Sequence, residues 1–231
     1  YTDCHEEGDG TYRGVEPYQP WCGKSAQTAG KSCLRALDPA SEKPLDTQEP
    51  DHMKLSETRI QQFQHRIWEY FYEYGRPFPW RNTNDQYEIL VSELMLQQTQ
   101  TERVVKKYQP FLDHFPNYQA LAEAPLSAVL QLWQGLGYNR RALGLKKIAE
   151  AVHEQHGDNL PDDQDTLLTL PMIGPATAGS LQAFIFQKPV AFIETNIRRV
   201  ILFFFFQNQE KVQDSEVLSV VEQVLDTADP R

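Results

Sequence analysis

Cysteine is scarce in this chain of 231 residues, which contains only three. Cys4, Cys22 and Cys33 do not have metal-ligand spacing, and an odd count without an apolar signal segment argues against a secreted disulfide scaffold. Long hydrophobic runs are missing as well, since the apolar run 200–206 is too short to cross a membrane. We therefore expect no metal site and no membrane partner.

Positive charge is also in short supply. The chain has 22 Lys and Arg against 32 Asp and Glu, a net charge of −10. This excess of acid argues against a nucleic-acid partner, because DNA phosphates are bound largely through Lys and Arg. Bases nevertheless cluster locally, and such patches bind phosphate even on acidic proteins, although each is also an ordinary solvated helix face: Arg103, Lys106 and Lys107; Arg140, Arg141, Lys146 and Lys147; Arg198 and Arg199.

The first 52 residues differ in composition from the rest of the chain. They are rich in Pro, Gly, Ser, Thr and acids and lack an apolar period, so we expect residues 1–52 to be a disordered or non-native extension, with Met53 as a candidate natural start. The remainder has enough hydrophobic residues for a core of one or two domains. Its periodicity predicts an all-α fold with helices over 56–74, 86–107, 109–114, 118–123, 126–134, 140–156, 164–169, 176–186, 196–206 and 214–226.

Residues 92–100, SELMLQQTQ, set one carboxylate and several amides in a strongly apolar run. A charge is rare there unless it is paired or used. At 3.6 residues per turn, Glu93, Gln97 and Gln100 would share a helix face, so a potential proton donor would lie beside two groups able to read a base edge. The alternative is the solvated stripe of an amphipathic helix.

Two further segments place polar groups at helix starts. Residues 170–179, LPMIGPATAG, form a Gly/Pro-marked turn between two helical stretches, and such a hairpin offers unpaired N–H groups to a phosphate. Residues 190–200, VAFIETNIRRV, end an apolar approach in Glu194, just before a helix that Thr195 or Asn196 would cap. The alternative for residues 170–179 is an ordinary helical turn, and the alternative for Glu194 is an acid that only stabilises the start of a helix.

Taken together, the three segments resemble the helix-hairpin-helix DNA glycosylase superfamily, and most closely its adenine DNA glycosylases. Residues 78–81, FPWR, and 132–142, LWQGLGYNRRA, support the resemblance, which covers Ser56 to the last residue. It implies an endonuclease III-like two-domain helical fold, truncated at the C-terminus. Residues 79–189 would form a helical barrel domain and residues 53–78 plus 190–231 a second, incomplete domain, with the active site in the cleft between them.

The resemblance also implies roles for individual residues. Glu93 matches the general acid that protonates adenine, and its apolar neighbours would raise its pKa. Glu194 stands where the family usually has an aspartate that stabilises the cationic sugar. The implied DNA contacts are Gln97 and Gln98 at the lesion and its partner base, Tyr138 as a wedge in the base stack, and Gln100, Arg140, Ile173, Gly174, Ala176 and Thr177.

Three positions depart from the family pattern. Glu194 carries an extra methylene relative to aspartate, which displaces its charge. Met172 replaces the usual first hairpin glycine, which leaves Gly174 as the one residue there free of a Cβ penalty at positive φ. Relatives that also cleave the strand carry a lysine where this chain has Ala176, so the resemblance implies a monofunctional enzyme.

The function implied is a base excision repair glycosylase that hydrolyses the N-glycosidic bond of adenine opposite guanine or 8-oxoguanine. It would act on double-stranded DNA as a monomer in the cytoplasm, at the nucleoid if the source is prokaryotic. A thymine or uracil mismatch glycosylase is the close rival, although Gln97, Gln98 and the absence of a tyrosine at position 176 favour adenine; a non-catalytic DNA-binding relative is the third reading. No cofactor is expected within the chain, and the sequence leaves open whether the family's four-cysteine iron–sulfur loop or a domain that recognises 8-oxoguanine follows residue 231.

Overall fold

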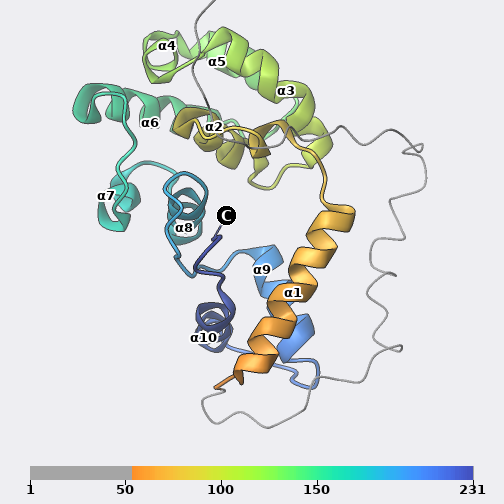
Figure 1. Cartoon of the computed structure of the whole chain (residues 1–231). Coiled ribbons are helices and arrows are strands. Elements are labelled where there is room, and N and C mark those ends of the chain that lie inside the picture. Colours follow the sequence, from red (N-terminus) through yellow and green to blue (C-terminus); the bar gives the residue numbers. More distant parts are fainter. Residues whose placement is uncertain (1–53, 231) are drawn as a thin grey trace, which may run out of the picture. The chain divides into compact units, whose positions relative to one another are not determined.

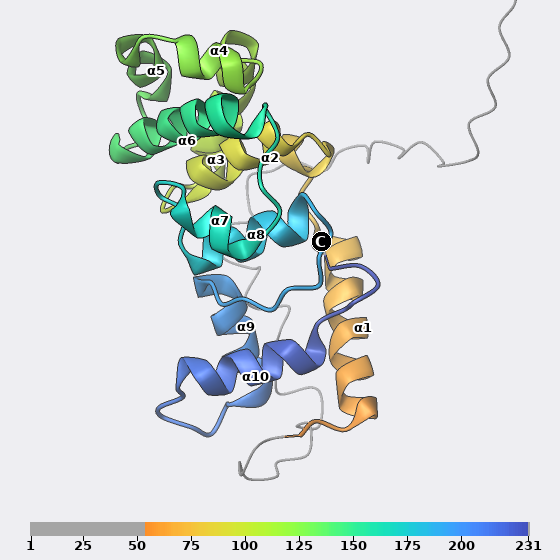
Figure 2. The same ribbon diagram turned by 90° about the vertical axis from the view of Figure 1, so that its left-hand side faces the viewer.

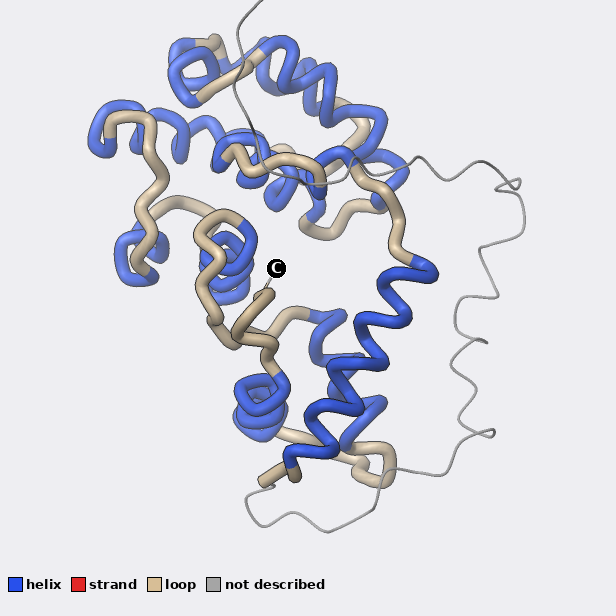
Figure 3. Tube along the Cα trace, viewed as in Figure 1, coloured by secondary structure: helices blue, strands red, loops and turns tan. Residues whose placement is uncertain are grey.

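The computed structural model describes residues 54–230, and that part of the chain contains helices and loops but no strand (Figures 1 and 3). The all-α prediction is confirmed there, whereas residues 1–52 and all three cysteines lie outside the described residues. No helix in this range is long and apolar enough to span a membrane. The elements are α1 (Glu57–Tyr74), the 3-10 helix η1 (Pro79–Arg81), α2 (Gln86–Leu96), α3 (Thr101–His114), α4 (Tyr118–Glu123), α5 (Leu126–Trp133), α6 (Arg140–His156), α7 (Gln164–Thr169), α8 (Pro175–Phe184), α9 (Thr195–Phe205) and α10 (Asp214–Val224).

The buried apolar side chains form two clusters. The larger one is built by η1 and by α2 to α8, with Tyr108, Phe111 and Trp133 among its bulkiest fully buried members. The smaller one joins Leu55 and Phe63 to the buried faces of α9 and α10, and Figure 2 shows α1 beside α10. The first helix therefore packs against the end of the described chain. The two-domain division proposed from the sequence stays a prediction.

Polar caps and a proline fix where the site-bearing helices begin. Asp85 caps α2 by accepting hydrogen bonds from the backbone N–H groups of Tyr87 at 2.8 Å and Glu88 at 3.1 Å. Such a cap stabilises a helix by about 1 kcal/mol. Pro175 occupies the first position of α8, where its missing N–H removes no helical hydrogen bond. Helices α2 and α8 then pack against each other.

The predicted continuous helix 86–107 is wrong. Helix α2 ends at Leu96, and Gln98 adopts a left-handed backbone conformation with φ 53°. The cause is tertiary, because the Arg141 guanidinium donates to the carbonyl oxygens of Leu94 and Met95, which a continuing helix would pair with its own N–H groups.

The predicted interruption between residues 107 and 109 is also wrong. Helix α3 runs through Pro110 without ending. Proline normally disfavours a helix interior because it lacks the N–H and crowds the preceding turn. Here Val104, Tyr108 and Phe111 are buried on one face of α3, and their packing outweighs the lost hydrogen bond.

Candidate active site

Glu93 lies in the second half of α2, among buried neighbours. Ser92 and Leu94 are 1% and 0% exposed, whereas Glu93 keeps partial exposure. Burial raises the pKa of the Glu93 carboxyl above its ordinary value, a hydrogen bond from Ser180 opposes that rise, and the charge of Glu194 adds to it. A carboxyl with these surroundings stays protonated at a pH where an ordinary glutamate has ionised, which a general acid requires.

Ser180 of α8 holds the Glu93 carboxyl. Its Oγ lies 2.7 Å from Oε2 of Glu93 and 3.0 Å from the backbone carbonyl oxygen of Thr177. Ser180 is itself buried. The sequence reasoning missed this residue, although a signal was present: Ser180 follows Thr177 by three positions and so shares its helix face.

Glu194 is the N-cap of α9. Its Oε1 accepts from the backbone N–H groups of Asn196 and Ile197, both at 2.7 Å, and its Oε2 accepts from Nδ2 of Asn196 at 3.3 Å. The expectation that Thr195 or Asn196 would cap this helix is therefore wrong, because the carboxylate that reaches the free N–H groups belongs to Glu194. Its negative charge acts on Glu93 and helps to raise the pKa of that carboxyl.

The amides that follow Glu93 lie in the loop between α2 and α3, so the predicted shared helix face of Glu93, Gln97 and Gln100 is wrong. Gln97 is directed back to the site, where its Nε2 donates to Oγ1 of Thr177 at 3.3 Å. Gln98 and Gln100 are exposed, and Gln100 begins α3 without a side-chain cap bond.

Tyr138 lies in the loop between α5 and α6, with 56% of its surface exposed. The loop turns through Gly135 at φ 93° and Gly137 at φ 76°, values that favour glycine. Tyr138 itself has φ 46°. An exposed ring held in a strained backbone conformation suits insertion between bases.

Arg141 ties the loop of Gln97 to the loop of Tyr138. It is 2% exposed and donates to both loops and to the end of α2. Its acceptors are the carbonyl oxygens of Leu94, Met95, Gln97, Leu136 and Gly137 and the hydroxyl of Thr99. The Arg141 guanidinium also lies over the Tyr138 ring, 5.5 Å from its centroid.

The sequence indicates Arg141 only as part of a basic cluster, and it predicts its neighbour Arg140 as a DNA contact. The structure leaves Arg140 exposed. Helical periodicity carried the missing signal, because Arg141, Leu145, Ile148 and Val152 recur on one face, and that face is buried.

The hairpin between α7 and α8 differs from its prediction at one residue. Met172, not Gly174, adopts positive φ, at 66°, while Gly174 has φ −99°. A left-handed non-glycine residue is strained by about 1–2 kcal/mol. Packing offsets this strain, because Met172 lies so close to Gly144 that a Cβ there would be 2.2 Å from its Cγ.

The other predicted hairpin contacts lie around the first turn of α8. The Ile173 side chain is buried in the core, and its N–H donates to the carbonyl oxygen of Leu170 at 3.3 Å. Ala176 and Thr177 occupy the first turn of α8, where N–H groups have no intrahelical acceptor. The backbone N–H groups at these two positions can therefore bind an anion.

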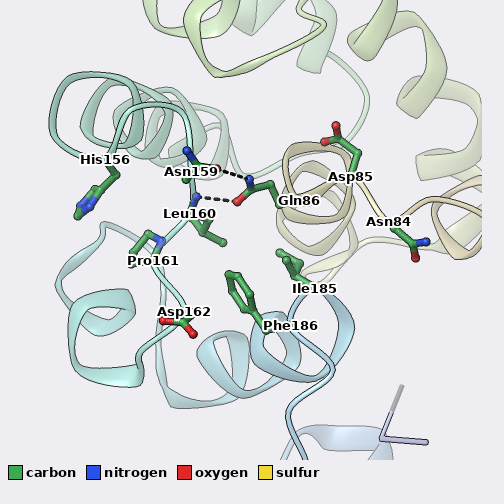
Figure 4. Close-up of a pocket in the computed structure, with 10 residues that line it drawn as sticks. All are labelled: Asn84, Asp85, Gln86, His156, Asn159, Leu160, Pro161, Asp162, Ile185 and Phe186. Atoms are coloured by element: carbon green, nitrogen blue, oxygen red, sulfur yellow. Dashed lines mark hydrogen bonds between the residues drawn. The ribbon is translucent and has the colours of Figure 1, made fainter.

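A surface pocket opens at the other end of α2 from Glu93. Figure 4 shows Gln86 reaching across it to Asn159 and Leu160, whose N–H donates to Oε1 of Gln86 at 2.6 Å. None of the predicted site residues lines this pocket.

Residues 54–230 hold no cysteine and no group of three or more potential metal ligands, so the described residues do not fit an iron–sulfur cluster.

A family model described as HhH-GPD superfamily base excision DNA repair protein matches residues 91–223, more than half of the chain. The chain belongs to this superfamily. It is similar to an adenine DNA glycosylase of Mycolicibacterium smegmatis, with 42% identity over 127 residues, or 54% of this chain and 43% of the relative. The chain thus spans less than half the length of the curated relatives it matches.

Two solved structures share the fold of this chain. A thermostable thymine-DNA glycosylase is 26% identical, with a TM-score of 0.67 over 75% of this chain and 81% of that one. An endonuclease III trapped as a covalent intermediate with DNA is 19% identical, with a TM-score of 0.62 over 75% of this chain and 80% of that one. The endonuclease III-like fold expected from the sequence is confirmed.

Proposed function

We propose that this chain is the catalytic part of a monofunctional DNA glycosylase that removes adenine paired with guanine or 8-oxoguanine. The observation that carries the proposal is the Glu93 carboxyl, which lies among buried neighbours and is hydrogen-bonded through Oε2 to Ser180, while the charge of Glu194 helps to raise its pKa. The name of the bacterial relatives, adenine DNA glycosylase, supports the choice of base.

The proposed reaction is a hydrolysis. Neutral Glu93 gives its proton to a ring nitrogen of adenine, and the electron pair of the N-glycosidic bond leaves with the base. The sugar is left as an oxocarbenium-like cation beside the negative charge of Glu194. Water adds to the cationic carbon and loses a proton, which restores neutral Glu93. Adenine and an abasic site are the products.

The remaining site residues would recognise the DNA. Gln97 donates to Thr177, one turn before Ser180 in α8, and a flipped base can replace that hydrogen bond. The exposed ring of Tyr138 would fill the stack that the base leaves. The N–H groups of Ala176 and Thr177 would bind a backbone phosphate. Since position 176 carries no amine, strand cleavage through a Schiff base is not part of the proposal.

The second candidate is a thymine or uracil mismatch glycosylase. The similarity to a thermostable thymine-DNA glycosylase favours it, because that likeness covers three quarters of the chain. A DNA-binding relative without activity is the third candidate. The glutamate at position 194, where the family usually has an aspartate, favours it. All three share the fold and differ in what happens to the base.

Base-release assays on four duplexes separate these candidates. The duplexes carry A opposite G, A opposite 8-oxoguanine, T opposite G and U opposite G, with Glu93→Gln as the matched inactive control under single-turnover conditions. We expect release of adenine from the first two duplexes and none from the others. Release of only thymine or uracil would replace adenine as substrate, and binding without release from all four would make the chain a non-catalytic member.

A further inference from the structure

Ser180 is the one side chain within residues 54–230 that is hydrogen-bonded to Glu93. We infer that Ser180 is a positioning residue: its hydroxyl holds Oε2 of Glu93 in both protonation states and leaves Oε1 to give the proton. The inference rests on the proposed function for its meaning in catalysis. The hydrogen-bond assignment itself is independent of which base is released.

The geometry offers the Ser180 hydroxyl two acceptors for its single hydrogen. Oε2 of Glu93 lies at 2.7 Å and the carbonyl oxygen of Thr177 at 3.0 Å. When Glu93 is ionised, the hydroxyl donates to Oε2. When Glu93 is protonated on Oε1, Oε2 still accepts from the Ser180 hydroxyl, and the acidic hydrogen on Oε1 is left for the base. No heavy atom has to move between the two arrangements.

A partner that bonds to Oε2 in both charge states suits an acid that must alternate between them. A hydrogen bond to a carboxylate is stronger than one to a neutral carboxyl, so Ser180 favours the ionised product of proton transfer. It therefore counteracts burial, which raises the pKa of Glu93, as does the charge of Glu194 at the start of α9. Among the described residues, Glu194 is the charged group that acts on Glu93. Gln97 and Thr177, which are hydrogen-bonded to each other, are neutral.

The chain supplies a matched control for this hydroxyl. Ser92 precedes Glu93 in α2, is 1% exposed, and donates to the backbone carbonyl oxygen of Ile89 at 2.8 Å. Ser92→Ala and Ser180→Ala each delete one buried hydroxyl from a helix, and alanine suits both helices. Only Ser180→Ala removes a bond to the acid.

The test titrates the whole chain carrying glutamate labelled with carbon-13 at the carboxyl. The Glu93 signal is identified as the one missing from Glu93→Gln, and its midpoint is measured by NMR in wild type, Ser180→Ala and Ser92→Ala. We expect Ser180→Ala to raise the midpoint by about one pH unit and Ser92→Ala to leave it unchanged. Single-turnover base release should show the same upward shift of its alkaline limb in Ser180→Ala, with a plateau roughly tenfold lower.

An unchanged midpoint in Ser180→Ala, or an equal shift in Ser92→Ala, would overturn the inference. So would a lowered plateau whose alkaline limb does not move, since a merely structural role for Ser180 gives that pattern. Failure of the proposed function looks different: the wild-type chain would release no base, while the NMR midpoint would still move in Ser180→Ala and support the role of its hydroxyl.

Discussion

Replacing Arg141 by leucine should destabilise the chain more than any surface substitution on α6. The side chain donates to three buried carbonyl oxygens, on Leu94, Met95 and Leu136. A buried acceptor left without a partner costs about 1 kcal/mol at the lower end of the usual range, so we expect Arg141→Leu to lose about 3 kcal/mol of unfolding free energy. Urea denaturation measures this loss, and Arg140→Leu, next to it and exposed, should stay within about 0.5 kcal/mol of wild type.

The same substitution should loosen two loops together. Because Arg141 bonds to Gln97 and Thr99 in one loop and to Leu136 and Gly137 in the other, backbone amides of both should lose hydrogen-exchange protection in Arg141→Leu. Arg141→Lys keeps the charge but has fewer donors, so an intermediate effect is expected. A loss below about 1 kcal/mol, or loosening of one loop alone, would refute the assignment of Arg141 as the tie between them.

Glu93→Gln should abolish base release and leave DNA binding nearly intact, and a retained rate above about a tenth of wild type would remove Glu93 from the mechanism. Because the pKa of Glu93 is raised in the fold, ionisation opposes folding: the stability of wild type relative to Glu93→Gln should fall as pH rises from about 4.3 to the folded pKa and stay constant above it, as denaturation across pH can check. Glu194→Gln keeps an oxygen for the N–H groups of Asn196 and Ile197, so its stability should change by at most about 1 kcal/mol, but it loses the charge and should lose excision by orders of magnitude. Glu194→Asp keeps the charge and should keep part of the rate. Near-normal excision by the glutamine variant would reduce Glu194 to a helix cap. Borohydride should trap little protein–DNA adduct because position 176 is alanine, and an adduct as abundant as the product would reveal another nucleophilic lysine.

The sequence alone determined the fold class and most helix bounds to within two residues, and it supplied the two carboxyls that are proposed to be catalytic. Periodicity is a local property, so helices such as 118–123, 140–156 and 164–169 were predicted with the bounds that the structure has. The Glu93 and Glu194 segments are recognisable in the sequence because a charge within an apolar run, or at its end, is rare without a use.

Only the tertiary structure decided how these residues meet. Helix α2 ends at Leu96 because the guanidinium of Arg141 donates to the carbonyl oxygens of Leu94 and Met95. No local pattern around residues 92–100 indicates that distant partner. Met172 holds the left-handed hairpin position because its side chain packs on Gly144. Ser180 bonds to Glu93 across 87 positions of sequence. Long-range packing and hydrogen bonds of this kind override local propensity, since burial and satisfied polar groups outweigh the small energies that propensity supplies.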